Sequence, residues 1–332
     1  MPETESGVFV QVRHWIWAID PIHVGMGRQQ ISRIDMPVTR EQGTQLPVIP
    51  GSSLTGVCRA YSAMKHAKGG LACAGKGNQD GEGHCGKSDC PVCHAFGFSR
   101  EKSTQSRQGL VQITTAHLLF FPIASQHGPV WITCNRSLKE AGWVPPEGFN
   151  TIVEPGHFVA INGTTGPRLG QVNTLALGWL NLQRQVCTVN VTAWNMFGSM
   201  ADGGAKSDAS MPFMNMLGPV VLVDDAHFGT LVNDNMEVRT LVSIKPDTGA
   251  ADAESGALFT YEAIPRGALL WFDVIFTRPK VYGLTEMTLP MLHKAVESGF
   301  SLMEYLGVGG MNTRGLGRIQ VLSAPCVIEG EV

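Results

Sequence analysis

Alternating apolar and polar positions predict a long strand at the start of the chain. The apolar residues change parity partway along this segment, as Val8, Val10, Val12 and then Trp15, Trp17, Ile19. A β-bulge adds one residue to a strand, so a bulge near Arg13 or His14 accounts for the change. Asp20 and Pro21 end the predicted strand.

Further stretches of the same kind predict more strands. They read "GLVQITTAHLLFFPI", "GPVWITC", "VVLVDD" and "ALLWFDVIF", with "SQHG" as a turn between the first two. The last stretch is apolar on both parities, which predicts a central strand buried on both faces. A short final strand is predicted from Arg318 to Leu322.

Two segments carry helical spacing. Pro50, Gly51 and Ser52 or Ser53 can start and cap a helix, whose apolar members are Leu54, Val57, Cys58 and Tyr61. Its first turn exposes backbone N–H groups beside two hydroxyls, which is either only a cap or an anion site. The second helix has Pro290 in its first turn and apolar residues at three- and four-residue spacing: Leu289, Leu292, Val296, Phe300, Met303 and Leu306.

The order of these elements predicts an α+β fold with an antiparallel sheet, because runs of strands are joined by only a few helices. The 332 residues are treated as one domain, 1–332, with insertions. Residues 140–218 show no clear period, and the Gly-, Ser- and Met-rich stretch within 180–218 predicts a flexible insertion.

The stretch "GVGGMNTRGLGRIQV", residues 307–321, joins the second helix to the last strand. A P-loop would place Lys and then Ser or Thr after the second glycine, but Leu316 and Gly317 follow Gly315. The dinucleotide fingerprint fails as well, since its third glycine position is Asn312. Two interpretations remain: a turn that needs glycine for its backbone, or a cradle for another phosphate.

Composition and charge narrow the class of protein. With 43% hydrophobic and 16% charged residues the chain is globular. Residues 1–110 hold 12 Lys and Arg against 9 Asp and Glu, a net of +3, while the rest holds 25 − 12 = 13 against 28 − 9 = 19, a net of −6. The first third is thus the better candidate to face an anion. No apolar run reaches the about 20 residues that span a bilayer, and the start lacks a signal peptide, so we expect a cytoplasmic protein.

Four cysteines gather in one polar stretch, "LACAGKGNQDGEGHCGKSDCPVCHAFG", within residues 69–98. Cys73, Cys85, Cys90 and Cys93 offer the four soft ligands of a tetrahedral structural zinc site, and the last pair forms a C-x-x-C knuckle. His84 or His94 could replace one of them. Free thiols or a redox pair are the alternatives, while a catalytic zinc is disfavoured because four protein ligands leave no open position.

The order of several motifs carries a resemblance. "HVGMG", "IDMPVTRE", "IPGSSLTGVCRAY", a Cys-rich insert ending "CHAFG", and "GVGGMNTRGLGRI" follow one another along the chain. This order resembles the RAMP superfamily of CRISPR proteins, and most closely the repeated backbone (Cas7-type) subunit of type III-B (Cmr) effector complexes. "AHLLFFPIASQHGPVWITC", "VVLVDDAHF" and "GALFTYEAIP" support that choice.

The resemblance implies a modified ferredoxin-like (RNA-recognition-motif-like) fold with a zinc-containing insertion and a thumb hairpin, the latter placed in the insertion at about 180–218. It implies partners as well: crRNA, target RNA, copies of the same chain in a filament, and further subunits, namely a large polymerase-like subunit, a small subunit and capping RAMP subunits. The activity it implies is an endoribonuclease that cuts target RNA at about six-nucleotide intervals, with a divalent cation such as Mg²⁺ or Mn²⁺.

The same resemblance assigns site residues. Asp35, in "IDMPVTRE", is the catalytic aspartate that it implies. Guide-RNA contacts are expected from the helix start, the glycine loop and nearby arginines: Arg28, Arg33, Gly51, Ser52, Ser53, Arg59, Gly309, Gly310, Asn312, Thr313 and Arg314. His23 lies near the loop that carries Arg28 and Arg33 and is left out of the catalytic set.

Three other functions stay open from the sequence. The first is the matching backbone subunit of the type III-A (Csm) complex. The second keeps the fold but leaves only a structural crRNA-binding subunit without catalysis. The third is a zinc-dependent enzyme acting on a small molecule, which would need an open metal position.

Overall fold

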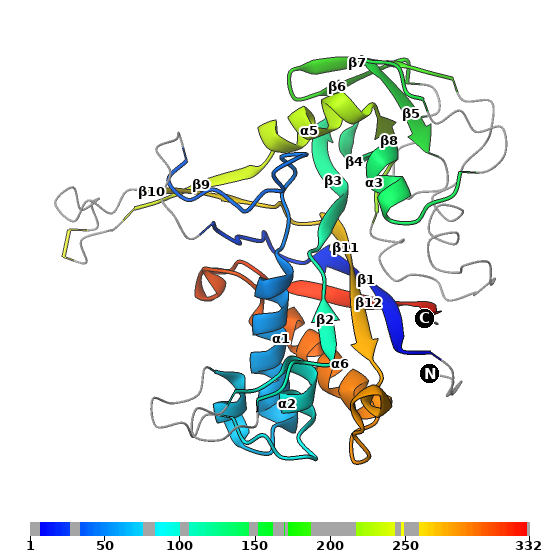
Figure 1. The fold of residues 1–332 in the computed structure, drawn as a ribbon. Coiled ribbons are helices and arrows are strands. Elements are labelled where there is room, and N and C mark those ends of the chain that lie inside the picture. Colours follow the sequence, from blue (N-terminus) through cyan, green and yellow to red (C-terminus); the bar gives the residue numbers. More distant parts are fainter. Residues whose placement is uncertain are drawn as a thin grey trace.

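The computed structural model describes residues 7–26, 34–75, 84–99, 106–145, 152–161, 169, 172–186, 217–242, 247–248 and 259–330. Arg28 and Arg33 lie outside these ranges, as does most of the insertion expected at 180–218. A large sheet runs through the molecule, with helices on both of its faces (Figure 1). The fold is therefore mixed α and β.

The first part of the sheet is antiparallel throughout. Its strands are β1 (Phe9–Ala18), β2 (Val111–Ile113), β3 (His117–Ser125), β11 (Leu269–Thr277) and β12 (Ile319–Gly330). Their order is β12–β1–β11–β3, and β2 also pairs with β11. The predicted bulge is confirmed, because the pairing of β1 with β12 shifts between Val12 and His14.

The second part of the sheet closes into a ring. Its strands are β4 (Gly128–Cys134), β5 (His157–Ile161), β6 (Thr174–Leu177), β7 (Leu180–Arg184) and β8 (Val220–Val223). From β3 the order runs β4–β8–β5–β7–β6, and β6 meets β3 again where Leu177 pairs with Ser125. The pairs β4–β8 and β5–β7 are parallel, so the expectation of a wholly antiparallel sheet is wrong for this part.

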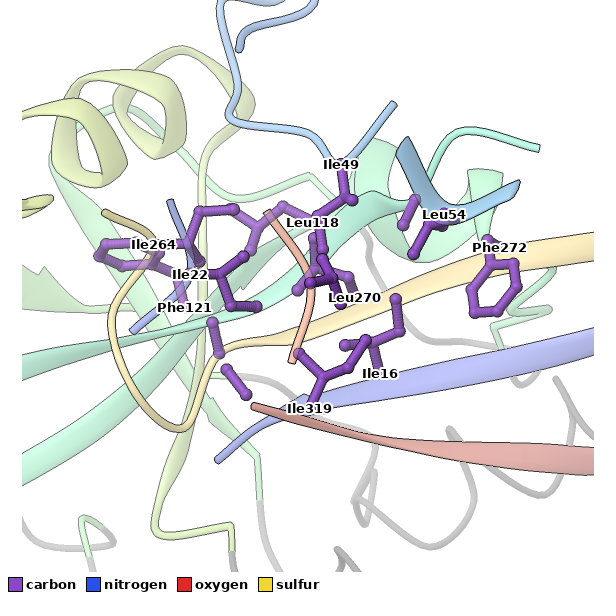
Figure 2. Packing of buried hydrophobic residues seen from close by; sticks show 14 of the residues in the cluster. Ile16, Ile22, Ile49, Leu54, Leu118, Phe121, Ile264, Leu270, Phe272 and Ile319 are labelled. Atoms are coloured by element: carbon purple, nitrogen blue, oxygen red, sulfur yellow. The ribbon is translucent and has the colours of Figure 1, made fainter. Parts of the chain in front are cut away.

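Two long helices cover one face of the antiparallel part. They are α1 (Gly51–His66) and α6 (Leu289–Leu306), and the second has the bounds that its apolar spacing predicts. Figure 2 shows Leu54 of α1 beside Ile16 and Phe272 of the sheet. The opposite face packs Trp15 against Leu138 and its neighbours in a second apolar cluster. As predicted, β11 is buried on both faces.

Shorter elements complete the described chain. They are the helices α2 (Pro91–Phe96), α3 (Asn135–Glu140) and α5 (Asp225–Asp234), and the 3-10 helices η1 (Gly70–Ala74), η4 (Pro279–Tyr282) and η5 (Asn312–Arg314). Strands β9 (Glu237–Leu241) and β10 (Phe259–Ala263) form a separate two-stranded sheet that reaches away from the body (Figure 1). Among the described residues, no helix is both long and apolar enough to cross a bilayer.

Residues 180–186 of the expected insertion have a different role from the one predicted. Leu180–Arg184 form β7, which pairs with both β5 and β6 inside the ring. The sequence pattern missed this strand because only Leu182 of its five residues is buried. The remaining part, 187–216, lies outside the described residues.

Candidate nucleic-acid interface and metal centre

Asp35 lies exposed beside β10, in a segment that pairs with this strand through Met36 and Tyr261. Its Oδ2 accepts hydrogen bonds from the Thr260 N–H at 2.7 Å and from Thr260 Oγ1 at 3.0 Å. The Asp35 N–H in turn donates to Thr260 Oγ1 at 3.2 Å. These hydrogen bonds lower the pKa of Asp35, because they stabilise the charged carboxylate. The bond from the Thr260 N–H has the larger effect and the bond from the Thr260 hydroxyl the smaller one. Asp35 is therefore a fixed anion at neutral pH.

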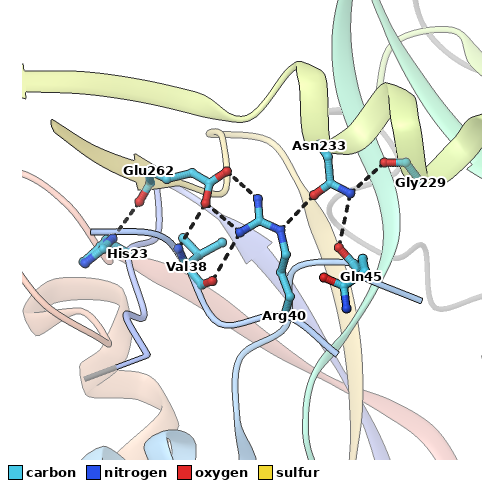
Figure 3. A network of polar contacts seen from close by, with 7 residues as sticks. All are labelled: His23, Val38, Arg40, Gln45, Gly229, Asn233 and Glu262. Atoms are coloured by element: carbon cyan, nitrogen blue, oxygen red, sulfur yellow. Dashed lines mark hydrogen bonds and ion pairs between the residues drawn. The ribbon is translucent and has the colours of Figure 1, made fainter. Parts of the chain in front are cut away.

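A buried ion pair anchors the segment that carries Asp35 (Figure 3). Arg40 donates to both carboxylate oxygens of Glu262, at 2.8 Å from Nη1 to Oε2 and by a second bond from Nη2 to Oε1. The Val38 N–H donates to the same carboxylate at 3.1 Å, and Arg40 Nε reaches Asn233 of α5 at 2.9 Å. Glu262 is buried, so this network ties the segment to both β10 and α5.

A small apolar cluster brings Asp35 and the glycine loop to the same region. It contains Tyr261, Ala263 and Leu316, with Met36, Leu241 and Met311 packed against them. Met36 follows Asp35, and Met311 lies inside the glycine loop. The structure thus joins three segments that are far apart in the sequence: 34–38, the β9–β10 hairpin and 307–317.

The glycines of residues 307–317 allow the chain to approach itself. Gly309 has φ +79°, and a Cβ there would overlap the carbonyl oxygen of His23. The Gly310 N–H donates to that same carbonyl at 2.8 Å. Gly317 has φ +89° and lies equally close to the Val308 carbonyl. We expected these glycines to admit a phosphate, but at Gly309 and Gly317 they are required by close contacts between backbone segments.

The outer side of the loop is still accessible. Gly309, Gly310, Thr313 and Arg314 are exposed, and Arg314 forms no ion pair with another described residue. Asn312 is half-buried, and its Oδ1 has no hydrogen-bond partner among the described residues. The side chains of Asn312, Thr313 and Arg314 can meet a ligand. The N–H groups of Val308, Gly310 and Gly317 are already bonded within the protein.

His23 lies directly beneath this loop and is 3% exposed. Its Nδ1 donates to the Glu262 carbonyl at 2.6 Å, and its ring meets Tyr261 edge-on with 5.9 Å between centroids. Because a carbonyl only accepts, Nδ1 carries a proton in this contact. Sequence reasoning set His23 aside. Gly25, two residues later, was the sequence signal that the His23 ring packs closely against backbone, since a Cβ on Gly25 would lie 3.2 Å from Nε2.

The start of α1 differs from the expected cap. Pro50 takes the N-cap position and has no side chain to offer, so neither Ser52 nor Ser53 is the cap. Gly51 packs against the connection from β2 to β3, where its N–H donates to Thr115 Oγ1 at 3.4 Å. The amides of Ser53 and Leu54 bond the Pro50 carbonyl. Ser52 is exposed and Ser53 half-buried in the first turn.

Arg59 has an internal role that its position on the helix did not reveal. Its guanidinium donates to the carbonyls of Cys73 at 2.8 Å, Phe96 at 3.3 Å and Gly97 at 2.9 Å. Burial lowers the pKa of Arg59. The side chain therefore fastens the cysteine-rich insertion to α1, and we remove it from the candidate RNA contacts.

The four predicted cysteines come together in space. The ligand sulfurs of Cys73, Cys85, Cys90 and Cys93 all lie within 4.8 Å of one another. Cys93 Sγ is 3.7 Å from both Cys85 Sγ and Cys73 Sγ. Four thiolates at the usual zinc–sulfur distance of about 2.3 Å are separated by about 3.8 Å along each edge of the tetrahedron. The cluster therefore has the ligand set and spacing to hold a metal ion.

The two histidines near this cluster point to backbone atoms. His84 Nε2 contacts the Gly75 carbonyl, and His94 Nε2 lies 3.2 Å from the Lys87 carbonyl. Among the described residues, the groups able to hold an ion comprise the four cysteines without either histidine. Replacement of a cysteine ligand by His84 or His94 is not favoured by this geometry.

Comparisons with known proteins place most of the chain in one family. A model of the RAMP superfamily matches residues 16–320. The CRISPR system Cmr endoribonuclease Cmr4 of Pyrococcus furiosus is 22% identical over 311 residues, covering 92% of this chain and 93% of that protein.

Solved structures share the fold at low sequence identity. A chain of the type III-B Cmr-beta complex bound to cognate target RNA matches with a TM-score of 0.59 at 13% identity, covering 95% of this chain and 97% of that one. Oligomeric Cmr4 from Pyrococcus furiosus matches with a TM-score of 0.54 at 19% identity, covering 98% and 100%. Together with the family match over nearly the full length, these findings show that the chain belongs to the RAMP superfamily.

Proposed function

We propose that this chain is a backbone subunit of a type III-B CRISPR effector complex, which binds crRNA along a filament of its own copies and cuts paired target RNA at regular intervals. The observation that carries the proposal is the apolar cluster in which Met36, the neighbour of exposed and hydrogen-bonded Asp35, gathers with Met311 of the glycine loop inside a RAMP chain. The full-length relative is named a Cmr endoribonuclease, which favours type III-B over type III-A. Large, small and capping subunits would complete the complex.

A ferredoxin-like palm fits the order of the strands. The elements β1, α1, β2 with β3, β11, α6 and β12 follow one another along the chain, and the sheet order is β12–β1–β11–β3. This is a βαββαβ unit with the last strand beside the first and the third beside the first on its other edge. We propose the projecting β9–β10 hairpin as the thumb, since Asp35 lies against its strand β10.

The proposed cleavage needs alignment more than covalent help. The 2′-hydroxyl of the target nucleotide attacks the adjacent phosphorus and gives up its proton, the bond from phosphorus to the 5′-oxygen breaks, and that oxygen takes up a proton. The products are a 2′,3′-cyclic phosphate and a 5′-hydroxyl. Asp35 supplies a fixed negative charge beside the RNA. A divalent cation such as Mg²⁺ or Mn²⁺ would neutralise charge on the phosphate, with Asp35 as the exposed carboxylate available to it.

Guide contacts are proposed on the glycine loop, the first turn of α1 and two arginines. On the glycine loop they are Gly309, Gly310, Asn312, Thr313 and Arg314; on the first turn of α1 they are Gly51, Ser52 and Ser53. Ser52 and Ser53 carry hydroxyls that can donate to phosphate oxygens, whereas the N–H groups of Gly51, Ser53 and Leu54 already bond within the protein. Arg28 and Arg33 stay in the proposal as basic residues of the intervening segment.

The purified protein tests this function directly. We expect it to carry discrete RNAs that share one repeat-derived 5′ tag, read by sequencing of the co-purifying nucleic acid. Random cellular RNA, or none, would contradict the proposed guide binding.

Arg314→Ala is expected to weaken guide binding through loss of one phosphate contact. Each phosphate contact contributes about 0.7–0.9 to the slope of log affinity against log salt, so the slope should become shallower by about that amount. Titration of labelled guide RNA at several salt concentrations measures this change. Arg318→Ala is the matched control, because Arg318 is also exposed but is engaged by Asp20.

Cys93→Ser is expected to remove the metal that we propose as structural zinc. Cys93 Sγ lies 3.7 Å from two other ligand sulfurs, and its loss should release zinc and open residues 69–98 to proteases. Native mass spectrometry and limited proteolysis measure both effects. Cys134→Ser is the control: burial raises the pKa of Cys134 to about 11, so this thiol stays protonated, and zinc content should not change. Wild-type protein without zinc would contradict the assignment.

A further inference from the structure

Asp35 has to be held in place by something other than packing. It is exposed, so neighbouring side chains do not restrict its rotamers as they would in a core. A carboxylate that acts on a phosphodiester must keep its position to a fraction of an ångström. The proposed function therefore requires a positioning group near Asp35.

Hydrogen bonds from one residue meet this requirement. The Thr260 N–H and the Thr260 hydroxyl both donate to Oδ2 of Asp35, at 2.7 Å and 3.0 Å. Two donors on one oxygen fix the plane and direction of the carboxylate. Within the described part of the chain, the second oxygen, Oδ1, has no hydrogen-bond partner, so it remains available to a ligand.

The backbone around this contact is fixed independently of the Thr260 side chain. The Met36 N–H donates to the Thr260 carbonyl at 3.1 Å, and the Glu262 N–H donates to the Met36 carbonyl at 3.0 Å. The buried Arg40–Glu262 pair secures the same two segments. Loss of the Thr260 hydroxyl would consequently leave the ladder intact and remove one of the two hydrogen bonds that hold the Asp35 carboxylate.

Of the two groups that hold Asp35, only the hydroxyl depends on which residue stands at position 260. Any residue except proline would supply the backbone N–H, whereas only Ser or Thr supplies a hydroxyl of this reach. The same oxygen accepts from the Asp35 N–H at 3.2 Å, so it bonds both the side chain and the backbone of Asp35. The β-branch of threonine further limits χ1, which holds the hydroxyl in place.

We propose that Thr260 is a positioning residue for RNA cleavage, which aims Oδ1 of Asp35 at the target RNA by holding Oδ2. This inference rests on the proposed function. It predicts that cleavage depends on a hydroxyl at position 260 and guide binding does not.

The experiment compares Thr260→Val, Thr260→Ser and Thr240→Val in the guide-loaded effector complex. Valine keeps the shape of threonine without the hydroxyl, and serine keeps the hydroxyl. Thr240 is the matched control because it pairs directly with Thr260 across the β9–β10 hairpin. Single-turnover cleavage of target RNA and guide affinity are measured for each variant, with Asp35→Ala alongside.

We expect T260V to cut about 10- to 100-fold more slowly, as is typical for loss of a group that orients an active residue. T260S should recover most of the wild-type rate, T240V should cut like wild type, and guide affinity should not change. Wild-type cutting by T260V, or equal loss of guide binding and cutting, would overturn the inference. If Asp35→Ala itself still cuts, the assignment of Asp35 fails instead, so the two failures are distinct.

Discussion

Asp35→Ala is expected to abolish cutting of guide-paired target RNA while guide binding persists. Asp35 is the exposed carboxylate that Thr260 holds by two hydrogen bonds, and it lies on the surface, so its removal leaves the core untouched. Loss of a positioned acid or base typically costs 10²–10⁴-fold in rate, so we expect a drop of at least about 100-fold. Gel analysis of labelled target RNA measures the rate, and guide titration measures binding.

Asparagine variants separate the charge of Asp35 from its shape. Asp35→Asn keeps an oxygen that can accept from Thr260 but removes the negative charge, and we expect it to be nearly as inactive as the alanine variant. Asp234→Asn is the control, because Asp234 is also exposed and accepts a hydrogen bond, from Trp179 at 2.7 Å. Unchanged cutting by Asp35→Ala would leave a structural crRNA-binding subunit as the better description of this chain.

Glu262→Gln is expected to destabilise the protein by about 3–5 kcal/mol, because it leaves the Arg40 guanidinium without a charge partner in a buried site. The Glu262 side chain is only 3% exposed and that of Arg40 20%. Arg40→Met should cost a similar amount, for the reverse reason. Unfolding in urea, followed by tryptophan fluorescence, measures the change in free energy.

The double variant and an exposed pair complete this test. Arg40→Met with Glu262→Gln should cost less than the sum of the two single changes, since neither charge is then buried alone. Glu237→Gln breaks the exposed pair with Arg239 on the neighbouring strand β9 and should cost less than about 1 kcal/mol. Equal costs at the two sites would show that the Arg40–Glu262 pair does not anchor the segment.

The parts of the fold with strong local patterns were predictable. Three elements follow from their own residues, without reference to the rest of the chain. They are β1 with its change of parity, β11 with apolar residues on both faces, and α6 with its helical spacing. The ring was not predictable in the same way. β6 and β7 have four and five residues, and their partners are set by tertiary contacts that no local pattern records.

The candidate site shows the same limit. Asp35 and Thr260 are 225 positions apart, so their contact follows from the topology and from no motif. Glycine at Gly309 indicated a close approach, but the pattern did not identify what approaches, which is the His23 carbonyl. The position of Arg59 on its helix suggested an accessible side chain. No local pattern shows that the backbone at Cys73 and Gly97 lies against this helix and binds the guanidinium.

Closure of the ring has a consequence for self-association. An open sheet offers a row of unpaired N–H and C=O groups at each edge, to which strands of other molecules can add without specificity. Because β6 returns to β3 at Ser125, one end of the strand path folds onto the sheet itself. A chain that is proposed to line up in many copies gains from this closure: contacts between copies then depend on side chains, which encode register, and indiscriminate strand addition leading to aggregation is suppressed at that end.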